Sequence, residues 1–308
     1  MNSAYKSEIL IGQLAAEALL EEVFTAPKPG LVDPYSTGAH KDMDLYTFKK
    51  STKAITPYFE EMALQGTFMY KEPENLFPVI RQIGIKAEQA MYQATGGINT
   101  HKGAIFTLGI LSAAAGVCFR KSYCVTSDAL LETEQKMTRT ILLDELKQLK
   151  SRSPKSSGER NLFQYGSTGI RGEAVEGYPS IRNYGLPVLR EGINSGQDWN
   201  LIKLQVLMTL MCSVEDGNIL ARTGMEGLKQ VQSIARDFLK NGGAYVNGAE
   251  KKLQALDLYF TERNYSSGGS ADLLAATIFI NSLIDALKDK EEFQCRKESY
   301  STAENWNS

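Results

Sequence analysis

Apolar residues recur every three or four positions along most of this chain, which is the spacing of one buried helix face. Leu10, Leu14 and Ala18, for example, share a stripe opposite Glu17 and Glu21. This spacing, with Asp44, Ser127 and Asp198 as N-capping residues, predicts helices over 7–24, 45–62, 75–94, 127–149, 198–214, 225–240, 249–263 and from 268 onward. No sustained two-residue alternation of β-branched side chains is present, so the predicted fold is all-α, a multi-helix bundle.

One further run, from Ala104 to Phe119, carries no charged residue and is apolar on every helical face. Such a helix belongs in the centre of a fold. It follows GGINTHKG, so a histidine, a lysine and free backbone N–H groups are expected at a buried helix N-terminus, which suits an anion. Taken alone, GGINTHKG is also typical of an ordinary helix C-cap, turn and N-cap.

The domain organisation is predicted from segments without helical spacing. Ser151–Ser167 is polar and rich in turn formers, so it is the predicted loop and would be the boundary of a chain with two lobes. The stretch from there through Pro187 is expected to be irregular. Residues 289–308 are polar and predicted to form a flexible tail. We interpret residues 1–308 as a single all-helical domain, with 151–167 as the alternative lobe boundary.

Five polar clusters lie at helix ends or in glycine-rich joints: PKPGLVD with GAHKDMD, GGINTHKG, STGIRGE, EDGNIL and GGSADLL. Side-by-side helices bring their ends into layers, so these joints are expected to meet at one mouth of the bundle, which would be the active site. Several carboxylates without cysteine favour Mg²⁺, which bridges substrate phosphates. Lysine, arginine and helix N-termini favour the phosphates themselves. The clusters therefore predict a nucleoside triphosphate with Mg²⁺.

Each cluster also has a simpler interpretation. Asp42 and Asp44 are typical capping residues, EDGN is typical of a turn, and Arg171 with Glu173 is typical of a surface pair. The histidines are harder to explain in this way, because the chain has only two and both lie in glycine-flanked charged clusters. No GxxxxGK[ST] and no strand followed by GxGxxG is present, which argues against a P-loop or Rossmann enzyme.

The composition limits the kinds of partner that this protein is expected to bind. Lys and Arg total 34 against 36 for Asp and Glu, a formal charge of -2, so no net field attracts nucleic acid or an anionic membrane. Four cysteines without metal-binding spacing predict reduced thiols in a cytoplasmic protein. No signal peptide is expected, and the 104–119 run is rich in alanine and glycine, as in a core helix rather than a membrane span. Apolar helix faces leave a homodimer open.

The clusters resemble, in order, the signature blocks of the triphosphoribosyl-dephospho-CoA synthase family: PKPGLVDPYSTGAHKDMD, GGINTHKGAIFTLGIL, STGIRGEAVEGYPS, EDGNILARTG and GGSADLLA. They extend from Pro27 to Ala275, and the first two are highly specific. The resemblance implies an all-helical enzyme that uses ATP and 3'-dephospho-CoA, releases adenine and joins the triphosphoribosyl group to the ribose of dephospho-CoA. The product would be the prosthetic-group precursor of citrate lyase or malonate decarboxylase, attached by a separate holo-acyl-carrier-protein transferase.

For that reaction we expect Glu173 or Asp33 to be the base for the acceptor hydroxyl, with the other stabilising positive charge on the sugar. His40 is expected to assist at adenine. The predicted Mg²⁺ ligands are Asp42, Asp44, Asp216 and Asp272. The predicted nucleotide-binding residues are Lys28, Lys41, Asn99, His101, Lys102, Arg171, Asn218 and Arg222.

The EDGN block departs from the family pattern, which commonly reads EDTN followed by a histidine, an arginine and two glycines. Gly217 and Ala221 here lack the hydroxyl and the imidazole, whereas Asp216, Asn218 and Arg222 are retained. Two other functions stay open. A Mg²⁺-dependent nucleotide hydrolase would release adenine or phosphate without an acceptor, and a non-catalytic helical partner protein would need neither ATP nor metal.

Overall fold

The computed structural model describes residues 3–121, 125–149 and 153–304, with side chains from residue 7 to residue 287. Every regular element in this part is helical, which confirms the all-α prediction. The helices are α1 (Ser3–Phe24), α2 (Leu45–Phe68), α3 (Leu76–Thr95), α4 (Lys102–Lys121), α5 (Ser127–Leu149), α6 (Ser157–Tyr165), α7 (Gly169–Val175), α8 (Leu186–Asn194), α9 (Trp199–Ser213), α10 (Gly217–Lys240), α11 (Ala249–Glu262) and α12 (Gly268–Glu304). Three single turns, Pro73–Asn75, Ile181–Gly185 and Gly243–Tyr245, join them.

Helix α4 lies at the centre of the fold, as its uncharged sequence predicts. It packs against α1, α2, α3, α5 and α12, and every residue from Ala104 to Cys118 except Phe106 is buried. By length and composition, Lys102–Lys121 and Gly268–Leu287 could each cross a membrane, but both windows are 78% buried inside the fold, as expected of core helices. Apolar residues from Ile11 to Leu287 form one main hydrophobic cluster.

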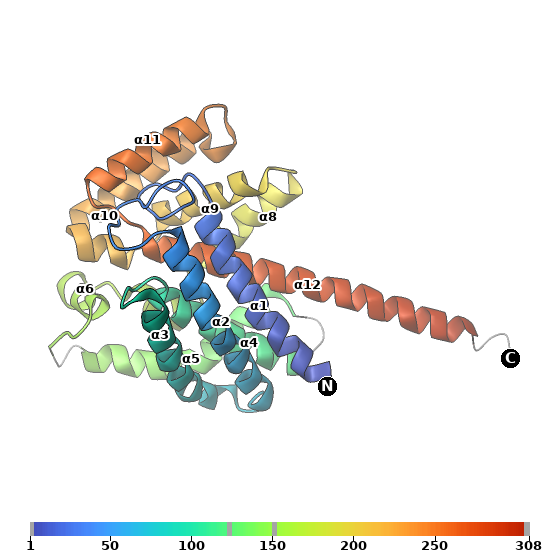
Figure 1. Ribbon diagram of the computed structural model, residues 1–308. Helices are drawn as coiled ribbons and strands as arrows, with labels where there is room; N and C mark the ends of the chain where they lie inside the picture. The colour runs from blue at the N-terminus through green and yellow to red at the C-terminus, as the bar shows by residue number, and fades with distance from the viewer. Residues whose placement is uncertain (1–2, 122–124, 150–152, 305–308) are drawn as a thin grey trace.

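The loop between α1 and α2, residues 25–44, lies beside the N-terminal half of α10 and the end of α11 (Figure 1). The guanidinium of Arg222 in α10 donates to the carbonyl of Ala39 over 3.0 Å. The backbone N–H of Gly30 donates to the carboxylate of Asp257 in α11 over 2.9 Å. The first polar cluster, in the 25–44 loop, is therefore held next to the EDGNILARTG block, which follows almost two hundred residues later in the chain.

Local signals set most helix ends as predicted. Asp44 caps α2 by accepting from the Thr47 amide, and Asp198 caps α9 by accepting from Asn200 and Leu201. Helix α5 differs, because Thr126, not Ser127, accepts the amide of Ala129 in its first turn.

Two segments predicted to be irregular are helical. Residues 151–167 contain α6, capped by Ser156 and closed by Gly166 in the left-handed conformation, so the loop prediction is wrong there. Its only buried residues are Glu159 and Asn161, and a helix without a buried apolar stripe leaves no periodic signal. The stretch before Pro187 forms the turn at 181–185 and the start of α8. Helix α12 continues to Glu304, and the flexible tail and the lobe boundary stay predictions.

Helices α2 and α4 approach closely because each presents a glycine to the other's backbone. A Cβ built on Gly66 would lie 2.0 Å from the carbonyl oxygen of Ala113, and one on Gly116 would lie 2.0 Å from that of Ala63. Backbone atoms cannot rotate away as a side chain can, so an added methyl group forces the two helices apart.

We expect Gly116→Ala to lower the free energy of unfolding by roughly 1–3 kcal/mol, because overpacking outweighs the better helix propensity of alanine. The matched control is Gly84→Ala in α3, where the nearest atom to an added Cβ is 3.7 Å away. That variant should be neutral or stabilising by up to about 1 kcal/mol. Urea denaturation of both variants measures the difference, and equal effects would contradict the close packing.

Candidate functional site

A cavity of about 80 Å³ lies where the ends of α1, α4, α10 and α12 meet the 25–44 loop. Residues from four of the five polar clusters line it, together with apolar side chains such as Leu19 and Phe48. The predicted site residues that the structure brings to this cavity are Lys28, His40, Asn99, His101, Asn218 and Asp272.

His101 lies on the cavity wall immediately before α4, and only 3% of it is exposed. Its Nδ1 is 2.6 Å from the hydroxyl of Ser51 in α2, and its ring packs edge-on against Phe48 at 4.9 Å between centroids. Its Nε2 is buried without a hydrogen-bond partner within the described part of the chain. Burial, aided by the positive charge of Lys28, lowers the pKa of His101 to about 3. The ring is therefore neutral, not the cation that the sequence pattern suggested for phosphate.

Asp272, immediately after the first turn of α12, places its carboxylate against the backbone of α4, where a Cβ on Gly103 would be 2.0 Å from Oδ2. No hydrogen bond or ion pair joins this carboxylate to another described residue. Burial, and then the negative charges of Glu22 and Asp216, raise the pKa of Asp272 well above its usual value. Asp272 is thus a carboxylate that faces the cavity and has a raised proton affinity, as a general base requires.

Asp216 lies close by but has no free coordination positions. One oxygen accepts the amides of Asn218 and Ile219, which caps α10, and the other accepts the amide and hydroxyl of Ser270 in α12. The carboxylate therefore joins the N-termini of two helices. Gly268 makes this approach feasible, since a Cβ there would lie 2.0 Å from the side-chain amide of Asn218.

Lys28 is 1% exposed, and its ammonium group forms an ion pair with the carboxylate of Glu22 in α1 and donates to the Glu22 carbonyl over 2.8 Å. Both residues line the cavity. The pair leaves little of the lysine charge for a substrate phosphate. The ion pair instead fixes the start of the 25–44 loop against the end of α1.

His40 lines the outer side of the cavity, and Arg222 of α10 contacts its ring. Nε2 of His40 is 2.8 Å from the Ser266 hydroxyl, and Arg222 approaches the other ring nitrogen at 3.3 Å. Burial and the Arg222 charge lower the pKa of His40, and the charge of Asp42, 3.9 Å away, opposes the shift. Arg222 lines a second cavity of about 260 Å³ with Arg160 of α6, and none of the described residues that line this cavity is a carboxylate.

Of the two departures from the family pattern, Ala221 lines this second cavity, and Gly217 contacts Asn161 on its wall. Ala221 is exposed and presents a methyl group to the second cavity, at the position where the family pattern has a histidine. The carbonyl of Gly217 accepts a hydrogen bond from the side chain of Asn161 in α6 over 2.8 Å, and a Cβ on Gly217 would still fit, 3.6 Å from Asn161.

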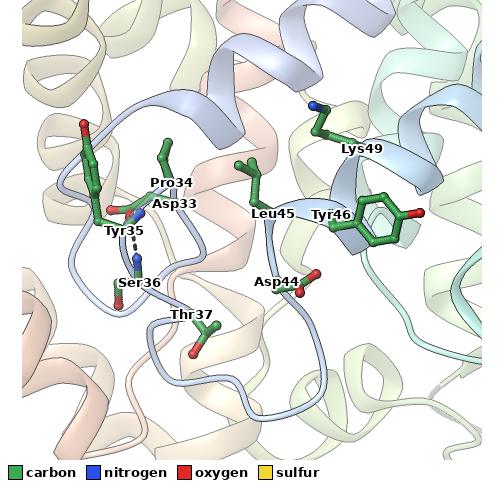
Figure 2. A pocket seen from close by; sticks show the side chains of 9 residues that line it. All are labelled: Asp33, Pro34, Tyr35, Ser36, Thr37, Asp44, Leu45, Tyr46 and Lys49. Carbon is green, nitrogen blue, oxygen red and sulfur yellow. Dashed lines mark hydrogen bonds between the residues drawn. The ribbon is translucent and has the colours of Figure 1, made fainter.

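Asp33, one predicted base, is turned into its own loop (Figure 2). Its Oδ1 accepts the amides of Tyr35 and Ser36, and its Oδ2 accepts that of Lys28. It lines a different, shallow pocket of about 400 Å³ outside the loop, which Asp44 also lines. All of these contacts shape the loop.

Glu173, the other predicted base, lies in α7, where it accepts the amide and hydroxyl of Ser180 at 3.1 and 2.6 Å. Burial raises its pKa. Burial, and then the negative charge of Glu134, raise the pKa of the Tyr178 hydroxyl well above its usual value. The charges of Glu173 and Asp272 add smaller shifts in the same direction. Glu173 is not among the residues that line the cavity, and both of its carboxylate oxygens accept from Ser180. Arg171, also in α7, is partly buried and lines neither cavity.

The four predicted metal ligands are not brought together. Asp44 is exposed and caps α2. Both carboxylate oxygens of Asp216 already accept hydrogen bonds, and Asp42 lies exposed on the 25–44 loop near His40. Among the residues with described side chains, no group of three or more metal-ligating residues forms. The carboxylates present therefore do not fit a metal held by the protein alone. Lys41 is exposed, Lys102 pairs with Glu88 over 2.8 Å, and Asn99 accepts the Lys102 amide to cap α4.

Two residues that contact the predicted site residues had no signal in the sequence. Ser51 occupies an ordinary position within α2, and Glu22 is one of several glutamates near the end of α1. Only the fold shows that the first contacts His101 and the second pairs with Lys28.

The buried neutral His101 has a measurable effect on acid stability. The unfolded chain titrates a histidine near about 6.5, so between that pH and about 3 it binds a proton that the folded protein does not. The free energy of unfolding therefore falls as pH falls through this window. We expect His101→Gln to make this slope shallower by up to about 1.4 kcal/mol per pH unit in urea titrations. His40→Gln, at a less buried ring, should change the slope less, and equal slopes in wild type and His101→Gln would contradict the buried neutral ring.

Comparisons with known proteins agree on one family. Residues 9–291 match the family model described as CitG, ATP:dephospho-CoA triphosphoribosyl transferase. A Vibrio cholerae protein named probable 2-(5''-triphosphoribosyl)-3'-dephosphocoenzyme-A synthase is 40% identical over 280 residues, 91% of this chain and 90% of its own length. A protein named 2-(5''-triphosphoribosyl)-3'-dephosphocoenzyme-A synthase from Escherichia fergusonii is 39% identical over 272 residues, 88% of this chain and 90% of its own.

A Salmonella typhimurium protein with the same probable assignment is 40% identical over 269 residues, covering 87% of this chain and 89% of its own. No solved structure matches the chain. The family model covers nearly all the described helices and every residue that lines the cavity. The chain therefore belongs to the ATP:dephospho-CoA triphosphoribosyl transferase family, a family of transferases.

Proposed function

We propose that this protein transfers the triphosphoribosyl group of ATP to 3'-dephospho-CoA with release of adenine, giving 2'-(5''-triphosphoribosyl)-3'-dephospho-CoA. One observation carries the proposal beyond family membership. The cavity joins four of the five polar clusters around Asp272, a carboxylate without a partner in the described part of the chain and with a raised pKa. A displacement at a sugar carbon needs such a base for the attacking hydroxyl.

Asp272 would take the proton of the acceptor hydroxyl as that oxygen bonds to C1' of the nucleotide and the bond from C1' to adenine breaks. The carboxylates around it would also stabilise the positive charge that develops on the sugar. Glu173 is the alternative base from the same family blocks, but both of its oxygens accept from Ser180 and it does not line the cavity. We therefore assign the base to Asp272. His40, on the outer side, keeps its proposed role at the leaving adenine.

The triphosphate would extend from the sugar toward Arg222 and Arg160, whose cavity carries two guanidinium groups and no carboxylate. Guanidinium groups bind phosphate oxygens with two parallel hydrogen bonds. Arg222 already holds Ala39 and Asn264 with one nitrogen, which fixes its position for such a contact.

Mg²⁺ stays part of the proposal as the counter-ion of the triphosphate. Magnesium commonly binds substrate phosphates and water with only one or two protein carboxylates. Asp42, 62% exposed beside His40, is the predicted ligand that could reach phosphates near Arg222. No step of the reaction is assigned to the metal.

The product would be passed to a holo-acyl-carrier-protein transferase for citrate lyase or malonate decarboxylase, in the cytoplasm. Both substrates and the product are soluble and phosphorylated, which suits this setting. We keep the homodimer as a prediction that size-exclusion chromatography would decide.

The proposal is tested by incubating the protein with ATP, Mg²⁺ and 3'-dephospho-CoA and following adenine and the coenzyme product by chromatography and mass spectrometry. Adenine that appears only with the acceptor, in equal amount to a triphosphoribosylated product, supports the transfer. Adenine or phosphate formed without acceptor would indicate a hydrolase. A folded protein that neither releases adenine nor gains thermal stability from ATP would indicate the non-catalytic partner.

A further inference from the structure

The size of the cavity at His101 limits what can enter it. Pockets that bury a whole small ligand usually measure at least about 300 Å³, whereas this cavity has about 80 Å³. It is therefore too small for a whole nucleotide and has room for only one part of it: the base, the sugar or a phosphate group.

The cavity presents one hydrogen-bond donor whose direction follows from its neighbours. The Thr100 hydroxyl donates to the Ser51 hydroxyl over 2.7 Å, so the Ser51 proton is left for Nδ1 of His101 at 2.6 Å. Nδ1 is then an acceptor, and the ring proton lies on Nε2. That N–H is buried and has no acceptor among the described residues. A buried donor without a partner is destabilising, so a ligand that supplies an acceptor there is favoured.

The cavity also presents an acceptor and a negative environment. Asp272 has no donor within the described part of the chain, and Glu22 and Asp216 lie near enough to raise its proton affinity. Lys28, the one lysine or arginine among the described residues that line the cavity, is bound to Glu22. This excess of carboxylates repels phosphate. A sugar hydroxyl is uncharged and both donates and accepts, which complements a neutral N–H beside a carboxylate.

We infer that the cavity holds the ribose of an adenine nucleotide, with the His101 N–H donating to a ribose hydroxyl and Asp272 accepting from a hydroxyl of the same sugar. Thr100 and Ser51 are positioning residues that keep the proton on Nε2. The inference rests on the proposed function, because both of its substrates carry an adenosine ribose. The sugar could be that of ATP or that of dephospho-CoA, and the two sources are distinguished below.

The first experiment uses ¹⁵N-histidine labelling, since the chain has only two histidines and His40→Gln assigns them. In the free protein, the His101 resonances should show a protonated Nε2 and a bare Nδ1. Thr100→Val, which removes the donor to Ser51, should give a mixture of both tautomers, whereas Thr100→Ser should keep the wild-type signal. ATP with Mg²⁺, or dephospho-CoA, should shift the Nε2 resonance, and the one that does identifies the sugar.

The second experiment compares that nucleotide with its 2'-deoxy and 3'-deoxy forms, by kcat/KM for ATP and by Kd from calorimetry for dephospho-CoA, whose 2'-deoxy form lacks the acceptor hydroxyl and cannot react. For the wild type, the analogue that lacks the bonded hydroxyl should be roughly 10²-fold poorer in that quantity, because it leaves His101 and Asp272 unpaired. His101→Phe should reduce this discrimination to less than about 10-fold. The analogue should also leave the Nε2 resonance of the wild type unshifted.

Several outcomes would overturn the inference. A shift of Nε2 by inorganic triphosphate would place phosphate in the cavity, and a shift by adenine alone would place the base there. Equal use of ATP and both deoxy forms by an active enzyme would remove the ribose contact while leaving the transferase function intact. Absence of any nucleotide binding, measured by calorimetry on the folded protein, would defeat the inference and the proposed function together.

Discussion

Asp272→Asn is expected to lower kcat/KM for triphosphoribosyl transfer by roughly 10²-fold or more, the usual contribution of a general base. The amide keeps the shape of the side chain but cannot take a proton. Stability should not fall, because the change removes a charge that Glu22 and Asp216 repel. In the wild type, kcat/KM should decrease as pH falls through the raised pKa of Asp272, well above the ordinary range of an aspartate.

The matched control is Asp144→Asn in α5, where the carboxylate is 61% exposed and pairs weakly with Lys147 at 3.5 Å. It should leave both kcat/KM and the melting temperature unchanged. Wild-type activity in Asp272→Asn would exclude Asp272 as the base and return that role to Glu173.

Gly103→Ala tests the same carboxylate without changing a polar atom. The new Cβ would lie 2.0 Å from Oδ2 of Asp272, and the end of this flexible side chain can rotate away. Activity should therefore fall while the melting temperature is kept, since alanine favours a helix more than glycine. Gly158→Ala in α6, where no atom lies within 4 Å of the added Cβ, should leave activity unchanged and keep or slightly raise the melting temperature.

Most of the fold was predictable because its helices are long and amphipathic. The ends of α2 and α9 follow from Asp44 and Asp198, whose side chains form caps with their own neighbours in the chain. Helix α6 was missed because what it buries is polar, Glu159 and Asn161, so its sequence resembles a loop.

The candidate site was predictable as a set of segments but not as a set of roles. Four clusters do meet at one cavity, because helix ends gather where helices pack side by side. Whether a carboxylate is free to act depends on partners from other segments, which no spacing reveals. The carboxylate of Asp216 accepts hydrogen bonds from Ser270, whereas that of Asp272 has no donor among the described residues. The roles assigned to both stay predictions until activity is measured.

Of the changes considered, breaking the ion pair between Lys28 and Glu22 at the cavity wall should have the largest effect on stability. Lys28 and Glu22 have side chains 1% and 7% exposed, so neither charge is screened by water. Lys28→Met would leave the Glu22 carboxylate buried without its cation. We expect the free energy of unfolding to fall by roughly 3–5 kcal/mol, as when one partner of a buried pair is removed. Urea denaturation at neutral pH measures this loss.

The double variant distinguishes a charge effect from a packing effect. Replacing both residues, Lys28→Met with Glu22→Leu, removes both charges, so it should recover most of the loss, because an apolar pair of similar size is often as stable as a buried ion pair. Lys147→Met, at an exposed pair, should change stability by less than about 1 kcal/mol. If the double variant were no more stable than Lys28→Met, the loss would come from packing around the lysine stem, and the ion pair would not be what holds the 25–44 loop at the cavity.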